Sequence, residues 1–227
     1  MKEKMVILER SHQNLIRNIN NMIKHDMEQG TSEWHHWRKG KVTGTTLKSI
    51  MGTPAKRQDT IYEIIAERLT VGTEGEENYE NPMDRGVRLE PDAIAMFELE
   101  TDKKVDRIGG ATDDDNPMIA NSPDGLIGET EAIEVKCMGG KNHIKMWLTN
   151  EIPDDYFWQV VQYFVVNEKL ETLYFVGYNP DIAVYPLHII EIDRQKIDKD
   201  IETARTKQIA FLSEVEAILS TLIELPN

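Results

Sequence analysis

The sequence predicts a single α/β domain, in which helices come first, a sheet follows, and helices with further strands close the chain. Three patterns predict this class: apolar residues at helical spacing in the first hundred positions, short runs bounded by Asp, Asn, Pro and Gly in the middle, and β-branched and aromatic runs before a long amphipathic segment. At 227 residues the chain can bury a sizeable core without disulfides. This order of elements favours one domain over two.

The first half of the chain has the pattern of successive amphipathic helices. In one of them, Ile61, Ile64 and Ile65 fall on a single helical face. Ser32 and Thr43 stand where each could cap the start of a helix. The expected helices are Met5–Met27, Ser32–Lys39, Thr43–Ile50, Gln58–Leu69 and Pro82–Glu100. We expect residues 1–28 to form an N-terminal helical extension and residues 29–227 to form the main domain.

From residue 105 onward the pattern changes to that of a strand meander followed by mixed elements. The short runs alternate with turn residues, and the two later runs are rich in β-branched and aromatic side chains. The expected strands are Val105–Thr112, Met118–Asn121, Gly125–Gly128, Ala132–Cys137, Thr172–Tyr178 and Ala183–Ile192. The expected helices are Lys141–Leu148, Asp154–Val166 and Asp193–Leu222. We therefore expect a mixed sheet flanked by helices.

Composition limits the classes of function open to the chain. It carries 26 Lys and Arg against 40 Asp and Glu, a net charge of −14, which argues against a protein that binds phosphates over its whole surface. The one cysteine, Cys137, excludes an intramolecular disulfide and a cysteine-rich zinc site, and it favours the cytoplasm. No apolar stretch approaches the roughly 20 residues that span a bilayer, so no membrane association is expected. The first ten residues lack the pattern of a signal peptide.

The segment from Ser122 to Lys136 carries the most chemical information. A Pro-Asp-Gly turn at Asp124 feeds one expected strand, and the next strand presents Glu134 and Lys136 on one face. Hairpin pairing of these strands would bring Asp124 beside Glu134. Two carboxylates and an ammonium at one point suit Mg²⁺, which would neutralise a scissile phosphate while the lysine positions water. The alternative interpretation is a surface turn beside an exposed Glu–Lys pair.

The Pro-Asp turn and the Glu-x-Lys strand resemble the Pro-Asp…(Asp/Glu)-x-Lys signature of restriction-endonuclease-like nucleases. The longer strings, Ser122–Leu126 and Glu134–Cys137, are similar to the phage recombination exonucleases typified by lambda exonuclease. Further blocks agree with that family in order, and these are Trp34–Thr45, Gly86–Glu90 and Trp158–Tyr163. The resemblance extends over most of the chain and implies a restriction-endonuclease-like core with a central mixed sheet.

The resemblance also implies roles for the matched residues. It assigns metal binding to Glu90, Asp124, Glu134 and the carbonyl group of Val135. It assigns the nucleophilic water to Lys136, with Gln159 orienting that group. It assigns the 5′-terminal phosphate to Arg38, Thr45 and Ser122, although the family has Ser at the position of Thr45. Taken singly, Glu90 and Arg38 could be ordinary surface residues, and Gln159 could cap a packed helix.

Charge distribution supports a local phosphate site without reference to any family. There is no acidic residue between Glu33 and Asp59 or between Glu134 and Glu151. The basic residues of the first window are Arg38, Lys39, Lys41, Lys48, Lys56 and Arg57, and the second window holds Lys136, Lys141, His143 and Lys145. These windows contain the expected phosphate pocket and the expected catalytic lysine, so the acidic remainder of the surface would confine DNA to one groove.

Together, the resemblance and the charges lead to a specific expectation of function. The resemblance implies a Mg²⁺-dependent exonuclease, with Mn²⁺ as a substitute, that degrades one strand of duplex DNA from a 5′-phosphorylated end. The 3′ overhang would serve single-strand annealing recombination in the bacterial host of a phage. The resemblance further implies a homotrimer with a single-strand annealing protein as partner. A repair or restriction endonuclease and a non-catalytic recombination partner protein are the alternatives.

Overall fold

The computed structural model describes residues 22–69 and 83–224 of the chain. Its helices are α2 (Ser32–Arg38), α3 (Gly44–Ile50), α4 (Pro54–Leu69), α5 (Met83–Thr101), α6 (Gly140–Thr149), α7 (Asp154–Val166) and α8 (Asp198–Glu224), with a 3₁₀ turn at Arg194–Lys196. Its strands are β1 (Ile23–His25), β2 (Gly110–Thr112), β3 (Ala120–Asn121), β4 (Gly125–Ile127), β5 (Glu131–Cys137), β6 (Thr172–Tyr178) and β7 (Leu187–Asp193). Within those ranges, no helix has the length and apolar character that crossing a membrane requires.

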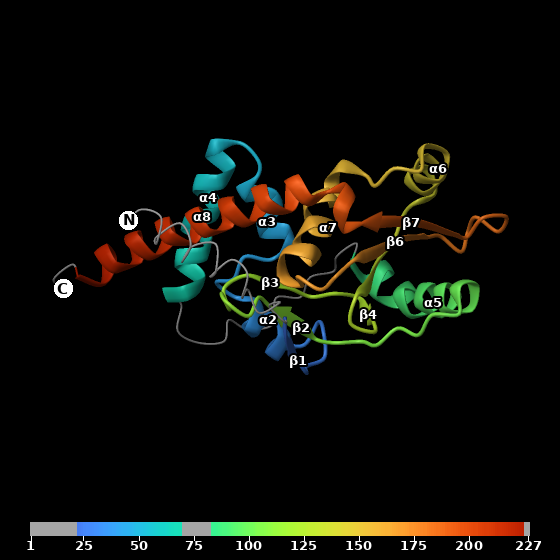
Figure 1. Ribbon diagram of the computed structural model, residues 1–227, viewed down its shortest axis with the longest axis horizontal. Helices are drawn as coiled ribbons and strands as arrows, with labels where there is room; N and C mark the ends of the chain where they lie inside the picture. The colour runs from blue at the N-terminus through green and yellow to red at the C-terminus, as the bar shows by residue number, and fades with distance from the viewer. Residues whose placement is uncertain (1–21, 70–82, 225–227) are drawn as a thin grey trace, which may run out of the picture.

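The strands form two sheets (Figure 1). The larger sheet has the order β4-β5-β6-β7, with β5 and β6 parallel and the two outer pairs antiparallel. The smaller sheet is antiparallel and has the order β1-β2-β3. Because parallel strands need a crossover, the chain passes through α6 and α7 between β5 and β6. The expected mixed sheet flanked by helices is confirmed.

Helices cover both faces of the larger sheet. On one face, Ala132 and Phe175 join a core cluster with Phe164 of α7 and residues of α3, α4 and α8. On the other face, Ile133 and Val135 pack in a second cluster with residues of α5. Strand β5 is therefore buried on both sides, and a polar side chain on it must find its partners inside the protein.

The long helix α8 runs along the outside of α7, α3 and α4, as Figure 1 shows in red. One face of α8 packs on these helices, and Ile201, Phe211 and Val215 are buried there. Arg57 of α4 forms an ion pair with Glu214 of α8 at 2.7 Å. The helix thus closes the core over the same helices that support the candidate site.

The prediction of an N-terminal helix reaching Met27 is wrong at its C-terminal end. Residues Ile23–His25 form strand β1, which pairs antiparallel with β2, with Ile23 opposite Thr112. The His25 ring nitrogen lies 3.1 Å from the Thr112 hydroxyl, and the His25 ring packs against Trp37 at a centroid distance of 5.0 Å. Long-range pairing has overridden the local helical spacing. The remainder of the predicted helix, from Met5 to residue 21, lies outside the described residues.

Other element boundaries also differ from the sequence predictions. Thr31 rather than Ser32 caps α2, because its hydroxyl accepts a hydrogen bond from the Trp34 N–H at 3.3 Å. Only the end of the expected strand Val105–Thr112 is strand, and the last expected strand begins at Leu187 because residues 182–185 form a turn. Such shifts follow from turn hydrogen bonds that the apolar pattern does not encode.

Candidate active site

Asp124 and Glu134 meet across a hairpin. Strands β4 and β5 are antiparallel with Gly125 opposite Ile133, so the next position along places Asp124 opposite Glu134. The Val135 N–H donates to Asp124 Oδ2 at 2.7 Å, which fixes the orientation of that carboxyl. The structure therefore brings the two acids together as the sequence predicted, while their catalytic roles stay predictions.

Glu134 is completely buried, with an exposed fraction of 0%. The Tyr163 hydroxyl of α7 donates to Glu134 Oε2, and the Lys136 ammonium forms an ion pair with Glu134 Oε1. Lys136 Nζ also lies 5.2 Å from the ring centroid of Tyr156, at the start of α7. The alternative of an exposed Glu–Lys pair on a surface strand is therefore wrong, because this pair lies between the sheet and α7.

Burial and mutual repulsion shift the protonation of this cluster. Burial raises the pKa of Asp124 well above its usual value, and the charges of Glu134 and Glu90 raise it further against the opposing effect of Lys136. Burial lowers the pKa of Lys136, but the carboxylates of Glu134 and Asp124 outweigh burial and leave that pKa raised. The lysine is therefore held as an ammonium, whereas Asp124 binds a proton more readily than an exposed aspartate.

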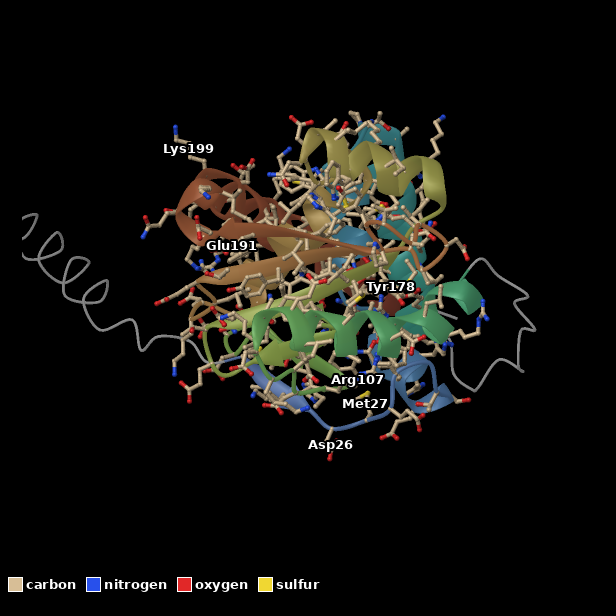
Figure 2. All side chains as sticks on the ribbon, turned by 90° about the vertical axis from the view of Figure 1, so that its right-hand side faces the viewer. Asp26, Met27, Arg107, Tyr178, Glu191 and Lys199 are labelled. Carbon is tan, nitrogen blue, oxygen red and sulfur yellow. The ribbon has the colours of Figure 1, made fainter. Side chains whose placement is uncertain are left out.

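Glu90 reaches the cluster from α5, on the other side of the sheet from Tyr163. Its carboxylate forms an ion pair with Arg107. Arg107 lies below the ribbon of α5 in the view of Figure 2. Burial raises the pKa of Glu90, Arg107 lowers it, and Glu134 raises it again. Glu90 is thus within electrostatic reach of Glu134, as its predicted position requires.

The donor chemistry of Glu90, Asp124 and Glu134 fits a hard divalent cation, since Mg²⁺ prefers carboxylate oxygens. The charge of Glu134 raises the pKa of both Asp124 and Glu90, and a cation would relieve this repulsion. In the part of the chain that the structure describes, no three His, Cys, Asp or Glu side chains form a ready metal centre. Instead, Lys136 is paired with Glu134, and Arg107 is paired with Glu90. A cation at this position would therefore replace ion pairs rather than fill a preformed cage.

A small pocket of about 30 Å³ lies beside the carboxylate cluster. The three residues predicted to bind a phosphate, Arg38, Thr45 and Ser122, all line this pocket. The other lining residues are Gly44, Asn121, Gln159 and Tyr163. Arg38 Nη1 donates to the Ser122 hydroxyl at 2.8 Å, and its guanidinium lies 4.4 Å from the ring centroid of Trp34. These contacts hold the planar guanidinium in one orientation toward the pocket.

Tyr163 connects the pocket to the carboxylate cluster, because it lines the pocket and donates to Glu134. Burial lowers the pKa of Arg38, and Glu67 and Glu134 act to raise it. Arg38 is therefore close enough to Glu134 for their charges to interact. The two predicted sites are neighbours in the structure, and the Tyr163 side chain contacts both.

A wider cavity of about 400 Å³ opens on the outer side of Arg38. Arg38 and Thr45 line both spaces, and the wider one is rich in hydroxyl groups and also carries Lys39, Lys41 and two glutamates of α4. Two other basic residues of the same acid-free window are neutralised elsewhere, since Lys48 pairs with Asp155 and Arg57 pairs with Glu214. Fewer basic residues are therefore available at the pockets than the acid-free window of the sequence indicated.

The two glutamines of α7 have different surroundings. Gln159 lines the small pocket and packs against Gly44, where an added Cβ would approach Gln159 Cγ to 3.0 Å. Gly44 therefore permits the close approach of α3 and α7. Gln162 is buried and donates to the carbonyl groups of Val42 and Ala120, each at 3.1 Å, which ties the smaller sheet to α7. The orienting role predicted for Gln159 toward Lys136 stays a prediction.

Sequence reasoning missed Tyr163 and Arg107. Tyr163 follows Gln159 by four residues, so the helical period itself places both on one face of α7. That spacing is a signal that could have identified the tyrosine. Arg107 meets Glu90 only because the chain returns past α5 after residue 101, and no local pattern indicates this.

A mixed sheet with helices on both faces, and a Pro-Asp turn paired in a hairpin with a Glu-x-Lys strand, define the class of restriction-endonuclease-like nucleases. Residues 33–170 match the model of the YqaJ-like viral recombinase domain, and the chain belongs to this lambda-exonuclease-like family. A comparison with curated proteins gave no match.

Solved structures agree with this assignment. The chain is similar to an alkaline exonuclease (LHK-Exo) from Laribacter hongkongensis, with 32% identity and a TM-score of 0.76 over 85% of this chain and 96% of that chain. The same exonuclease in complex with dAMP matches with 33% identity and a TM-score of 0.75 over the same shares. A phage-related exonuclease from Haemophilus somnus 129PT shares the fold, with 13% identity and a TM-score of 0.56 over 81% of this chain and 96% of that chain.

Proposed function

We propose that this protein is a divalent-metal-dependent exonuclease that degrades one strand of linear duplex DNA from a 5′-phosphorylated end. The product would be a duplex with a 3′ single-stranded overhang. Membership of a viral recombinase family and similarity to an alkaline exonuclease support the reaction class. That relative binds dAMP, a deoxynucleoside monophosphate of the kind that an exonuclease releases.

The observation that carries this proposal is the adjacency of two sites of different chemistry. One is a buried hairpin with Asp124 and Glu134, and the other is a small pocket beside Arg38 and Ser122. Tyr163 lines the pocket and donates to Glu134, so it contacts both sites. An enzyme that holds a terminal phosphate in the pocket would present the next phosphodiester to the carboxylates, so cleavage would begin at the end of the strand.

The residues of the cluster divide the work of hydrolysis among them. Glu90, Asp124, Glu134 and the carbonyl group of Val135 would hold Mg²⁺ or Mn²⁺, and a bound cation supplies charge neutralisation at the scissile phosphate. Lys136, held as an ammonium, would position the attacking water and stabilise the charge that develops on the phosphate. Gln159 would orient this group from α7.

Arg38 supplies recognition of the end rather than chemistry. A guanidinium presents paired N–H donors that match two oxygens of a terminal phosphate. Ser122 and Thr45 add hydroxyl donors to the lining of the same pocket. Burial of Arg38 strengthens these contacts because less water competes for them.

The resemblance to lambda-exonuclease-like proteins supports the remaining parts of the proposal. We propose a homotrimer that acts on DNA ends in the cytoplasm of a bacterial host, with a single-strand annealing protein as its partner. Size measurement in solution and co-purification with the annealing protein test these two parts separately from catalysis.

The proposal is tested with one linear duplex prepared with 5′-phosphate or 5′-hydroxyl ends and labelled on each strand in turn. With Mg²⁺ or Mn²⁺, the phosphorylated duplex should be degraded faster, and only from its 5′ ends, whereas chelation should stop the reaction. Equal rates on both ends would contradict the phosphate pocket. Cleavage of closed circular DNA would favour an endonuclease, and a lack of hydrolysis across a full metal titration would favour a non-catalytic partner protein.

A further inference from the structure

An exposed apolar surface lies at the end of the molecule where α6 meets the turn between β6 and β7 (Figure 1). We call it the α6 platform, and its members are Ile144, Trp147, Leu148, Val184 and Tyr185. Leu148 and Val184, which follow and precede the paired rings of Trp147 and Tyr185 in the chain, are 72% and 77% exposed. The proposed catalytic reaction assigns no role to this surface.

The two aromatic rings of the platform are stacked on each other. Their centroids lie 4.4 Å apart with an interplanar angle of 32°, one ring from Trp147 of α6 and the other from Tyr185 of the turn. The buried ring nitrogen His143 Nε2 lies 2.7 Å from the Tyr185 carbonyl oxygen and donates to it. His188 and Asn150 are linked in the same region at 3.0 Å. The platform is therefore held in place by hydrogen bonds to both of its elements.

Lysines alternate with apolar residues on the exposed face of α6. His143 and Met146 are buried on the inner face, so the outer face presents residues at positions i, i+3, i+4 and i+7. These residues are Lys141, Ile144, Lys145 and Leu148. No acidic residue occurs between Glu134 and Glu151, so the helix forms a positively charged surface on a chain of net charge −14.

The platform adjoins the candidate active site through the neighbouring strand. Lys136 of β5 is paired in register with Gly177 of β6. An added Cβ on Gly177 would lie 2.8 Å from Met146 Sδ, so the inner face of α6 packs directly on that glycine. The inner face of α6 thus packs on the residue of β6 that is paired with the proposed catalytic lysine.

The chemistry of this surface matches single-stranded nucleic acid. Exposed aromatic and apolar side chains stack with unpaired bases, and interspersed lysines bind the phosphates between them. Duplex DNA hides its base faces and offers no such stacking. A second copy of this chain fits poorly, because lysines are depleted from the centre of protein interfaces, and Lys141 and Lys145 share the outer face of α6 with Ile144 and Leu148.

We propose that the α6 platform binds unpaired DNA next to the active site, with bases stacked on Trp147 and Tyr185 and phosphates held by Lys141 and Lys145. This inference deepens the proposed nuclease function and rests on it for the origin of the strand. It adds a site that holds the single-stranded part of the substrate while the neighbouring cluster acts on the duplex part.

The inference is tested by fluorescence anisotropy of a labelled 20-nucleotide oligo-dT with the full chain in EDTA, which prevents cleavage. Trp147→Ala and Tyr185→Ala should each weaken binding about 5- to 150-fold, since stacking contributes roughly 1–3 kcal/mol per base. Tyr185→Phe, which keeps the ring, should bind like the wild type. Tyr62→Ala is the matched control, because Tyr62 is an exposed aromatic residue of α4, distant in sequence from the platform.

A double lysine variant, with a matched double variant as its control, tests the role of the lysines and leaves the aromatic rings unchanged. The double change Lys141→Gln with Lys145→Gln should reduce the slope of log affinity against log salt by about 1.4, since each phosphate contact on a single strand contributes about 0.7. The matched control is Lys199→Gln with Lys207→Gln, two exposed lysines of α8. A thermal melt of every variant checks that it folds.

Three outcomes separate the possibilities. Unchanged oligo-dT affinity and salt slope in the folded platform variants would overturn the inference. A smaller particle mass by light scattering with unchanged affinity would show that the platform is instead an interface between copies. If the wild-type chain binds oligo-dT through the platform but hydrolyses no duplex under any metal, the proposed nuclease function fails while the binding site stands.

Discussion

The buried carboxylate hairpin and the Arg38 pocket differ in how their charges are balanced. In the hairpin, Glu134 has no exposure and is balanced by Lys136, so positive and negative charge compensate within the protein. In the pocket, Arg38 donates to the hydroxyls of Ser122 and Thr43 and lies over the Trp34 ring, and among the described residues it forms no ion pair. The guanidinium therefore keeps donor capacity for an added anion. The proposed chemistry would thus take place where water is excluded, and the proposed recognition where charge remains available.

The largest effect should follow from the removal of the hairpin ammonium. Lys136→Ala should lower the rate of duplex hydrolysis about 10²- to 10⁴-fold, the range expected for a group that positions or transfers a proton. DNA binding measured in EDTA should persist. Lys103→Ala is the matched control, since Lys103 is paired at 2.8 Å with Glu131 at the start of the same strand. Full hydrolysis by Lys136→Ala would break the assignment of chemistry to the hairpin.

A smaller effect should follow in the pocket, and it should depend on the substrate. Arg38→Ala should slow digestion of 5′-phosphorylated ends about 10- to 100-fold, because a hydrogen bond to a charged group contributes about 1.5–3 kcal/mol. Digestion of 5′-hydroxyl ends should change little. Arg57→Ala, which removes an arginine of α4 paired with Glu214, is the control. An equal loss on both kinds of end would mean that Arg38 supports the fold rather than the phosphate.

A third prediction concerns pH and the stability of the hairpin without metal. Because the pKa of Asp124 is raised above its usual 3.8 in the folded protein, its contribution to stability is complete below that value and is lost as pH rises through the raised pKa. Asp124→Asn has no such charge. The free energy of unfolding of Asp124→Asn in EDTA should therefore rise relative to that of the wild type as pH increases from about 4. The difference should grow by on the order of 1 kcal/mol by pH 8.

Urea unfolding at several pH values measures this difference. Mg²⁺ should then stabilise the wild type more at alkaline than at acidic pH and should stabilise Asp124→Asn less. Asp59→Asn, an exposed aspartate of α4, serves as the control and should follow the wild type. A difference between Asp124→Asn and the wild type that stays constant with pH would contradict the raised pKa.

The smallest effect should come from the edge of the cluster. Arg107→Ala should strengthen Mn²⁺ binding up to about fivefold, because the half-exposed ion pair between Arg107 and Glu90 competes with the metal by about 1 kcal/mol or less. Calorimetry of Mn²⁺ binding measures this change. Lys104→Ala removes a comparable surface pair with Glu98 and should leave the affinity unchanged. Weaker Mn²⁺ binding by Arg107→Ala would instead show that Arg107 positions Glu90.

The hairpin was predictable from the sequence because its parts are close in the chain. Asp124 and Glu134 lie ten residues apart, and strand alternation together with a turn was enough to place them side by side. The pocket needed the family resemblance, since Arg38 and Ser122 are 84 residues apart. The resemblance named both residues, but the stacking of Arg38 on Trp34 came only from the structure.

The elements that escaped prediction depend on contacts that local pattern does not contain. Strand β1 forms because Ile23 pairs with Thr112, far along the chain, although the local spacing is helical. The burial of Glu134 was also unexpected, because a charged residue on a strand usually indicates an exposed face. Here Tyr163 and Lys136 supply internal partners: strand alternation places Lys136 on the face of Glu134, whereas the contact with Tyr163 depends on how α7 packs on the sheet.

Helix α7 touches both regions one turn apart, with Gln159 at the pocket and Tyr163 on the buried glutamate. Gly44 lets α3 pack tightly on this helix, so a displacement at one end of the pair is transmitted to the other. Occupation of the pocket and the protonation of the carboxylate cluster therefore both depend on the position of α7. Substitutions in α7 that change the proposed recognition of DNA ends should therefore also change the pKa values of the carboxylate cluster, and both properties will have to be optimised together.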